Sequence, residues 1–123
     1  MSPRASSATA HELQRIGLLA SLPGETLTRL AARMVREDVP PGGAVVVEGE
    51  RDDRFYVVLS GLFTVSQVDL GPRRVLRPGE YFGEVAAAMN VPRTASVRAL
   101  TPATVASCDR ETFDELVRPL FSD

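Results

Sequence analysis

Between residues 35 and 108, short β-rich segments alternate with clusters of glycine, proline and aspartate, and this rhythm limits the fold more than any other feature. Many short strands at near-regular spacing, separated by turn residues, are typical of a β-sandwich or barrel. We therefore expect a mainly β fold, with strands at residues 44–48, 54–59, 62–68, 73–76, 96–100 and 103–108.

One of the separating clusters has the form of a tight turn. Ser60 and Gly61 lie between two strongly apolar segments. Glycine adopts a positive φ without steric cost, which two-residue hairpin turns require. The sequence therefore predicts a β-hairpin at this point, with a positive φ at Gly61.

Helical periodicity flanks the β-rich region on both sides. Thr9 and Glu12 have the spacing of a capping box, and apolar residues recur after them at helical intervals. Pro23 and Gly24 divide this region into two short helices. After the last strand a final helix is expected, capped by Asp109, with an apolar face of Phe113, Leu116, Val117, Leu120 and Phe121. Residues 1–8 are predicted to be a flexible tail, and residues 9–123 a single domain.

The composition argues against several classes of protein. A formal net charge of −2 provides no basic field that would hold nucleic acid. With one cysteine and one histidine, Cys108 and His11, the chain is not expected to contain a disulfide or a metal site, and Cys108 lies in an apolar stretch typical of a buried structural thiol. No catalytic triad or acid–base pair stands out, so we expect no enzyme activity.

The chain is also expected to be cytoplasmic. No apolar run approaches the roughly 20 residues of a membrane-spanning helix. We therefore expect that this chain does not insert into a membrane. Whether the parent protein is a membrane protein stays open.

One interval does not follow the strand rhythm. Residues 82–90 are small and compatible with a helix, and Pro92 ends the pattern. A helix start exposes unpaired amides to an anion, Gly83 allows close approach to the backbone, and Arg93 can bind two phosphate oxygens at once. Glu84 is suited to accept a hydrogen bond from a sugar hydroxyl. From these residues alone, a plain helical turn with a solvated arginine is an equally good interpretation.

A resemblance to a known family favours the anion site. The strings FGEVA at 82–86 and PRTASV at 92–97 resemble the phosphate-binding cassette of the cyclic-nucleotide-binding domain family. The strings PGG at 41–43, EGE at 48–50, DRFYVVLSG at 53–61 and PGEYFGE at 78–84 follow in the order and approximate spacing of that family. The similarity extends from about residue 18 to about residue 120.

The resemblance implies a role for each residue of the cassette. Glu84 would bind the ribose 2′-hydroxyl and Arg93 the exocyclic phosphate oxygens. Gly83 would let the ligand approach the backbone closely, and backbone amides around Val85, Ala86 and Ala95 would complete the phosphate cradle. The ligand would be cAMP or cGMP, bound without a further cofactor.

The base would lie against a different group of residues. Thr94 occupies a position where members that accept cGMP often carry threonine, although threonine there does not exclude cAMP. Leu76, Val65 and Arg74 would line the base, with the Arg74 guanidinium stacked on the purine. The alternative for Leu76 and Val65 is that they are ordinary core residues of the β-roll.

The resemblance also implies the architecture and a regulatory role. The expected fold is a β-roll, also described as a double-stranded β-helix or jelly roll, with N-terminal helices, a C-terminal helix and no lid helix after residue 119. The chain would be the sensor of a bacterial channel, transporter or enzyme, acting on an effector that this chain does not contain. Two alternatives stay open: a binding-incompetent member that serves as a protein-interaction scaffold, and a small enzyme of the cupin type.

Overall fold

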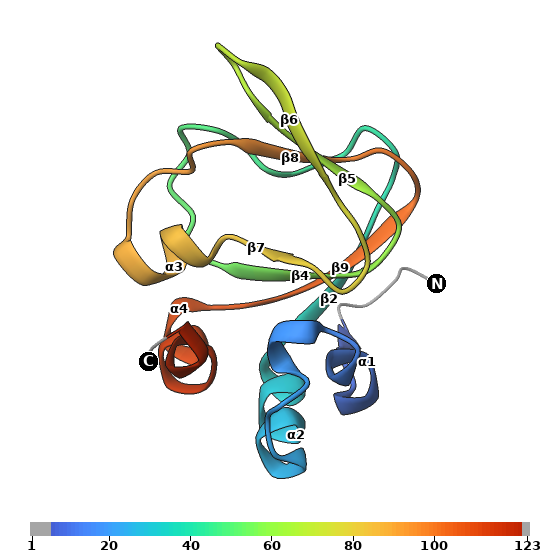
Figure 1. Ribbon diagram of the computed structural model, residues 1–123, viewed down its shortest axis with the longest axis vertical. Coiled ribbons are helices and arrows are strands. Elements are labelled where there is room, and N and C mark those ends of the chain that lie inside the picture. Colours follow the sequence, from blue (N-terminus) through green and yellow to red (C-terminus); the bar gives the residue numbers. More distant parts are fainter. Residues whose placement is uncertain (1–5, 122–123) are drawn as a thin grey trace.

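The computed structural model describes residues 6–121, which form two antiparallel sheets with helices at one side (Figure 1). The first sheet has the order β1 (Ser6–Ser7), β2 (Val35–Val39), β9 (Ala103–Cys108), β4 (Phe55–Ser60) and β7 (Tyr81–Phe82). The second has the order β3 (Ala44–Val46), β8 (Ser96–Ala99), β5 (Phe63–Gln67) and β6 (Gly71–Leu76). The predicted mainly β roll is confirmed.

Strand β4 is buried on both faces because the first sheet lies between two cores. Phe55 and Val57 point toward the helices, whereas Tyr56 and Val58 point toward the second sheet. Successive side chains of a strand face opposite ways, so a continuous apolar run suits a strand that is covered on both sides. The segment from Phe55 to Val58 is therefore buried between the two cores of the molecule.

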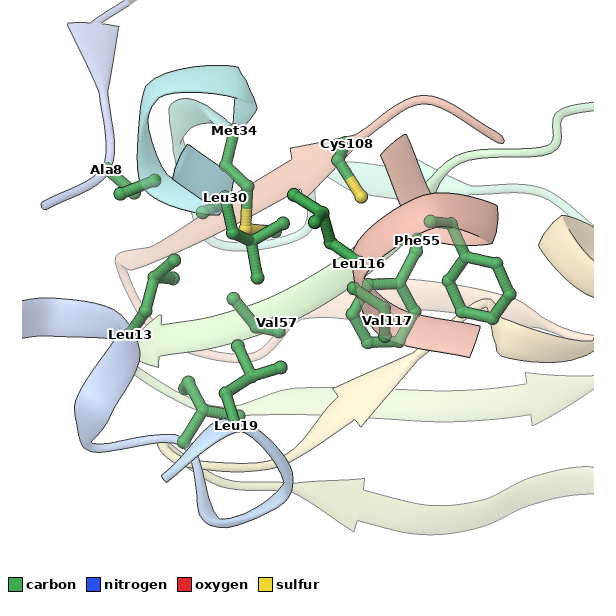
Figure 2. Close-up of a cluster of buried hydrophobic side chains, with 14 of the residues drawn as sticks. Ala8, Leu13, Leu19, Leu30, Met34, Phe55, Val57, Cys108, Leu116 and Val117 are labelled. Atoms are coloured by element: carbon green, nitrogen blue, oxygen red, sulfur yellow. The ribbon is translucent and has the colours of Figure 1, made fainter. Parts of the chain in front are cut away.

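The N- and C-terminal helices cover the outer face of the first sheet, where Figure 2 shows the core that they share with β4 and β9. They are α1 (Ala10–Gln14), η1 (Gly17–Leu19), α2 (Gly24–Arg33), α4 (Arg110–Thr112), the π-helical turn η2 (Phe113–Val117) and η3 (Arg118–Phe121). The remaining helix, α3 (Glu84–Met89), follows β7 and lies at the end of the roll (Figure 1). Both predicted caps are confirmed: Thr9 forms a capping box with Glu12, and Asp109 accepts the amide of Thr112. No helix of residues 6–121 is long and apolar enough to span a membrane.

The thiol of Cys108 lies in this core. It is fully buried, and burial raises its pKa to about 12. The thiol therefore stays protonated at neutral pH, as expected for a residue that only packs.

The expected hairpin at Ser60 and Gly61 is wrong. Strands β4 and β5 belong to different sheets, so this turn carries the chain from one sheet to the other. The positive φ at Gly61 is confirmed at 79°. Glycine is required there for a second reason: a Cβ atom would lie 2.5 Å from the Cβ of Ala103. Close packing against the start of β9 bends the chain out of the plane of the first sheet.

The structure also corrects the end of the expected tail. Residues 1–5 lie outside the described residues, but Ser6 and Ser7 pair with Arg36 and Val35 of β2. Ala8 is buried, and its amide donates to the carbonyl of Met34 at 3.1 Å. The segment 6–8 is therefore an ordered part of the domain.

Candidate functional site

The turn between β7 and α3 is built around Gly83. This residue has a φ of 89° and precedes the helix, and its carbonyl accepts the amide of Ala87 at 3.1 Å. The amides of Glu84, Val85 and Ala86 come before that first helical hydrogen bond, so they have no acceptor within the helix. A Cβ atom at position 83 would lie 2.7 Å from the carbonyl oxygen of Arg54. Glycine is therefore required by the packing of the turn itself.

A hollow that is open to solvent lies between this turn and the second sheet. It brings together nearly all the residues that the sequence singled out, from three separate parts of the chain. They are Val65, Arg74, Gly83, Glu84, Val85, Ala86, Arg93, Thr94 and Ala95. The side chains at 84 and 93 therefore share one hollow, which is what the proposed anion site requires.

Arg93 is the most unusual residue in this hollow, because it is a charged residue that is only 6% exposed. Its Nη2 donates to the carbonyl of Arg54 at 2.8 Å and lies 3.2 Å from Oδ2 of Asp52. Its Nη1 makes only a long contact of 3.5 Å with the carbonyl of Gly83. Its buried Nε has no hydrogen-bond partner among the described residues. The guanidinium is thus fixed at one end and retains donors for an incoming acceptor.

Tyr56 supports the guanidinium from β4. Its ring lies 5.7 Å from the Arg93 guanidinium carbon and stacks on Phe82 with the centroids 4.9 Å apart. Burial, together with the charge of Asp52, raises the pKa of Tyr56 to about 12. The hydroxyl therefore stays neutral and donates to Oδ2 of Asp52 at 3.4 Å. The aromatic face provides a cation–π contact for Arg93 in a partly desolvated setting.

The opposite rim of the hollow is held by hydrogen bonds from the second sheet and its loops. Gln67 Nε2 donates to the carbonyl of Thr94 at 3.0 Å, and the amide of Glu48 donates to the hydroxyl of Ser96 at 2.8 Å. Glu84 and Arg74 lie where this hollow meets a neighbouring one. Thr94 and Arg74 are exposed, so both are accessible to a ligand that enters from solvent.

Leu76 is the predicted site residue that lies elsewhere. It is fully buried in the core between the two sheets, with Phe63 and Val58. Val65 packs against the same core but also reaches the hollow. Leu76 is therefore an ordinary core residue, whereas Val65 belongs both to the core and to the hollow.

Several residues of the site were not among those predicted from the sequence. Val46, Phe82, Pro92 and Val97 line the hollow. In the sequence Asp52 belongs to a turn cluster, and nothing in its spacing from Arg93 shows that the two meet. Within the described residues, no group of three His, Cys, Asp or Glu side chains is placed to hold a metal ion.

Comparison with known proteins identifies this arrangement. The family described as "Cyclic nucleotide-binding domain" matches residues 36–119, which include both sheets' long strands, α3 and Arg93. The chain belongs to the cyclic nucleotide-binding domain family. The matched residues include the helical insertion α3 and the turn at Gly83 that precedes it.

Relatives of this cyclic nucleotide-binding domain include the cAMP-dependent protein kinase regulatory subunit of Yarrowia lipolytica. The two are 37% identical over 109 residues, which is 88% of this chain and 29% of that protein. The chain thus spans little more than a quarter of the length of this relative. Such relatives are fungal and give no support to the expected bacterial channel or transporter.

Solved structures support the same fold. The structure described as "cAMP bound PfPKA-R (141-441)" has a TM-score of 0.85 and 26% identity, covering 90% of this chain and 39% of that chain. The regulatory domain of Toxoplasma gondii PKA with cAMP has a TM-score of 0.83 and 26% identity, covering 90% and 44%. The expected β-roll with flanking helices is thus confirmed by known structures as well as by its own topology.

Proposed function

We propose that this domain binds cAMP or cGMP in the hollow between α3 and the second sheet and serves as the sensor of a regulatory protein. The observation that carries the proposal is that Glu84 and the buried Arg93 line one hollow beside the positive φ turn at Gly83. A pocket with a few convergent polar groups is the default place for a small ligand.

The phosphate is proposed to lie on Arg93 and the start of α3. The guanidinium is nearly buried and keeps an unpartnered Nε among the described residues. A buried cation of this kind is stabilised by an anion that satisfies its remaining donors. Val85 and Ala86 line the same hollow, and their amides, which have no acceptor within the helix, would add further donors without adding charge.

The sugar and base are proposed to extend from Glu84 toward the open side of the hollow. Glu84 is half-buried and accepts the ribose 2′-hydroxyl in this arrangement. Exposed Arg74 and Thr94 then border the purine, and Arg74 can stack on its face. Because the rim is polar on both sides, it accommodates adenine and guanine, and cGMP stays a candidate beside cAMP.

The regulatory role follows from the relatives. The curated relatives are cAMP-dependent protein kinase regulatory subunits, and two related solved structures are described with cAMP. We infer that the effector is a protein kinase catalytic subunit and that the domain itself is not an enzyme and works in the cytoplasm. Nucleotide binding would shift the populations of two arrangements of the helices around the roll.

Isothermal titration calorimetry of the purified chain with cAMP, cGMP and 5′-AMP tests the proposal. We expect one site per chain for at least one cyclic nucleotide, and much weaker binding of 5′-AMP, whose phosphate is not tied back to the sugar. Chromatography of the ligand after incubation should recover it unchanged. If neither cyclic nucleotide binds, the scaffold alternative replaces the sensor; conversion of the nucleotide would instead indicate an enzyme.

A further inference from the structure

Asp52 holds the guanidinium of Arg93 from a loop that follows β3. Its Oδ1 accepts the backbone amide of Arg54 at 3.0 Å, which ties the carboxylate to its own loop. Its Oδ2 lies 3.2 Å from Nη2 of Arg93 and accepts the hydroxyl of Tyr56 at 3.4 Å. The carboxylate is thus held in place by two neighbours while it contacts the cation.

The pair is asymmetric in its burial. The Arg93 side chain is 4% exposed, whereas that of Asp52 is 30% exposed. Among the residues that the structure describes, Asp52 is the one carboxylate within 4 Å of this guanidinium. A buried cation without a counter-charge is costly, so Asp52 stabilises the nucleotide-free domain.

The same carboxylate acts against a bound phosphate. Nη2 already serves two acceptors, Asp52 and the carbonyl of Arg54. A phosphate that binds Arg93 in a bidentate manner needs two neighbouring nitrogens of the guanidinium. An arginine offers two such edges, Nε with Nη2 and Nη1 with Nη2, and Nη2 belongs to both. The phosphate therefore either displaces Asp52 or lies beside it as a like charge.

We propose that Asp52 is a stand-in anion for the phosphate: it neutralises Arg93 in the nucleotide-free domain and thereby lowers the affinity for the nucleotide. The proposal rests on the proposed function, because it assumes that the phosphate binds at Arg93. Loss of the Asp52 charge strengthens nucleotide binding in two ways. Removing the charge of Asp52 destabilises the free domain more than the bound one, and it also removes repulsion in the bound one.

The test is Asp52→Asn, which keeps the size of the side chain and an oxygen for the Arg54 amide. We expect cAMP or cGMP to bind about three- to tenfold more tightly by calorimetry. We also expect the nucleotide-free variant to melt at a temperature about 5 °C lower. Asp53→Asn is the matched control, since it removes the same charge one residue along and Asp53 has no ion pair with Arg93 among the described residues.

Further variants separate this role from a merely structural one. In an Arg93→Met background, Asp52→Asn should no longer lower the melting temperature, because no cation is left to neutralise. Should Asp52→Asn fail to fold alone, refolding with and without cAMP decides: recovery only with cAMP supports the stand-in role, and recovery with neither overturns it.

Each remaining outcome is decisive. If the unmodified chain binds a nucleotide and Asp52→Asn binds it equally or more weakly, Asp52 is not a competitor, and the proposed function stands. If only Asp52→Asn binds, the competition is stronger than expected and the proposal is supported. If neither binds, the stand-in role and the proposed function both fall.

Discussion

Gly83 and Arg93 are packed so closely that a Cβ atom at position 83 would lie 2.9 Å from Nη1 of Arg93. The two residues belong to different segments, separated by α3 and the loop that follows it. The amide-rich turn and the guanidinium are therefore one packed unit, and a change in either displaces the other.

Gly83→Ala should destabilise the domain more than an ordinary glycine substitution in the left-handed region. Backbone strain at a φ of 89° costs about 1–3 kcal/mol, and the contacts with Arg54 and Arg93 add to it. Gly42→Ala is the control, because Gly42 has a φ of 82° and a methyl group there would meet nothing within 4 Å. Urea unfolding of both variants measures the difference. Equal losses would show that Gly83 is not closely packed.

Arg93→Ala should abolish most nucleotide binding. Truncating one partner of a buried charged contact costs about 2–5 kcal/mol, so the affinity should fall about thirtyfold or more. Arg98→Ala, which removes an exposed arginine of β8, should leave the affinity unchanged. Calorimetry with cAMP and cGMP measures both variants. A loss of less than about threefold at Arg93 would remove it from the phosphate site.

Glu84→Ala should weaken binding through the sugar alone. A charge-assisted hydrogen bond to a hydroxyl contributes about 1.5–3 kcal/mol. The 2′-deoxy analogue of the nucleotide should therefore bind more weakly than the parent nucleotide to the unmodified chain, and equally well to the variant. This double cycle is measured by calorimetry. If the deoxy analogue still loses affinity in the variant, Glu84 does not contact the 2′-hydroxyl.

Asp109→Ala should lower stability in a pH-dependent way. Hydrogen bonds from Thr112 hold the pKa of Asp109 below its ordinary value. A depressed folded-state pKa means that the stabilisation is complete above about pH 4 and is lost as the pH falls toward the folded-state pKa. Removing the cap should cost about 1 kcal/mol at pH 7, and this difference should shrink at pH 3. Thermal melts at both pH values measure it, with the exposed Asp69→Ala as control.

Arg118→Ala should loosen the end of α3. Nη2 of Arg118 donates to the carbonyl of Ala88 at 2.9 Å, where the negative end of the helix dipole favours a cation. Faster hydrogen exchange is therefore expected at the amide of Asn90, which bonds to the carbonyl of Ala86 at 2.9 Å. Arg110→Ala is the control, since Arg110 also pairs with Asp114, with its Nε 3.9 Å from the carboxylate. The control therefore removes an arginine from the same ion-pair partner. Unchanged exchange at Asn90 would show that the C-terminal segment does not support α3.

Local signals in the sequence were reliable where the physical cause is local. The caps at Thr9 and Asp109 depend on residues three positions away, and both formed. The segment 103–108 became β9 with the same bounds. Strand β2 was missed because Arg36, Glu37 and Asp38 do not resemble a strand, and only pairing with β9 makes them one. The sequence predicted a turn at Gly61, but it did not predict that the turn leads from one sheet into the other.

The chain's own residues determined that a small helix with a glycine before it and an arginine after it interrupts a series of short strands. That much follows from backbone propensity, turn chemistry and side-chain type, which act over a few residues. Tertiary structure alone decided that Asp52 and Tyr56 meet Arg93, that Leu76 turns into the core, and that Ser60 and Gly61 connect two sheets. These relationships depend on strand pairing and burial between distant segments, and spacing along the chain carries no information about which segments will meet.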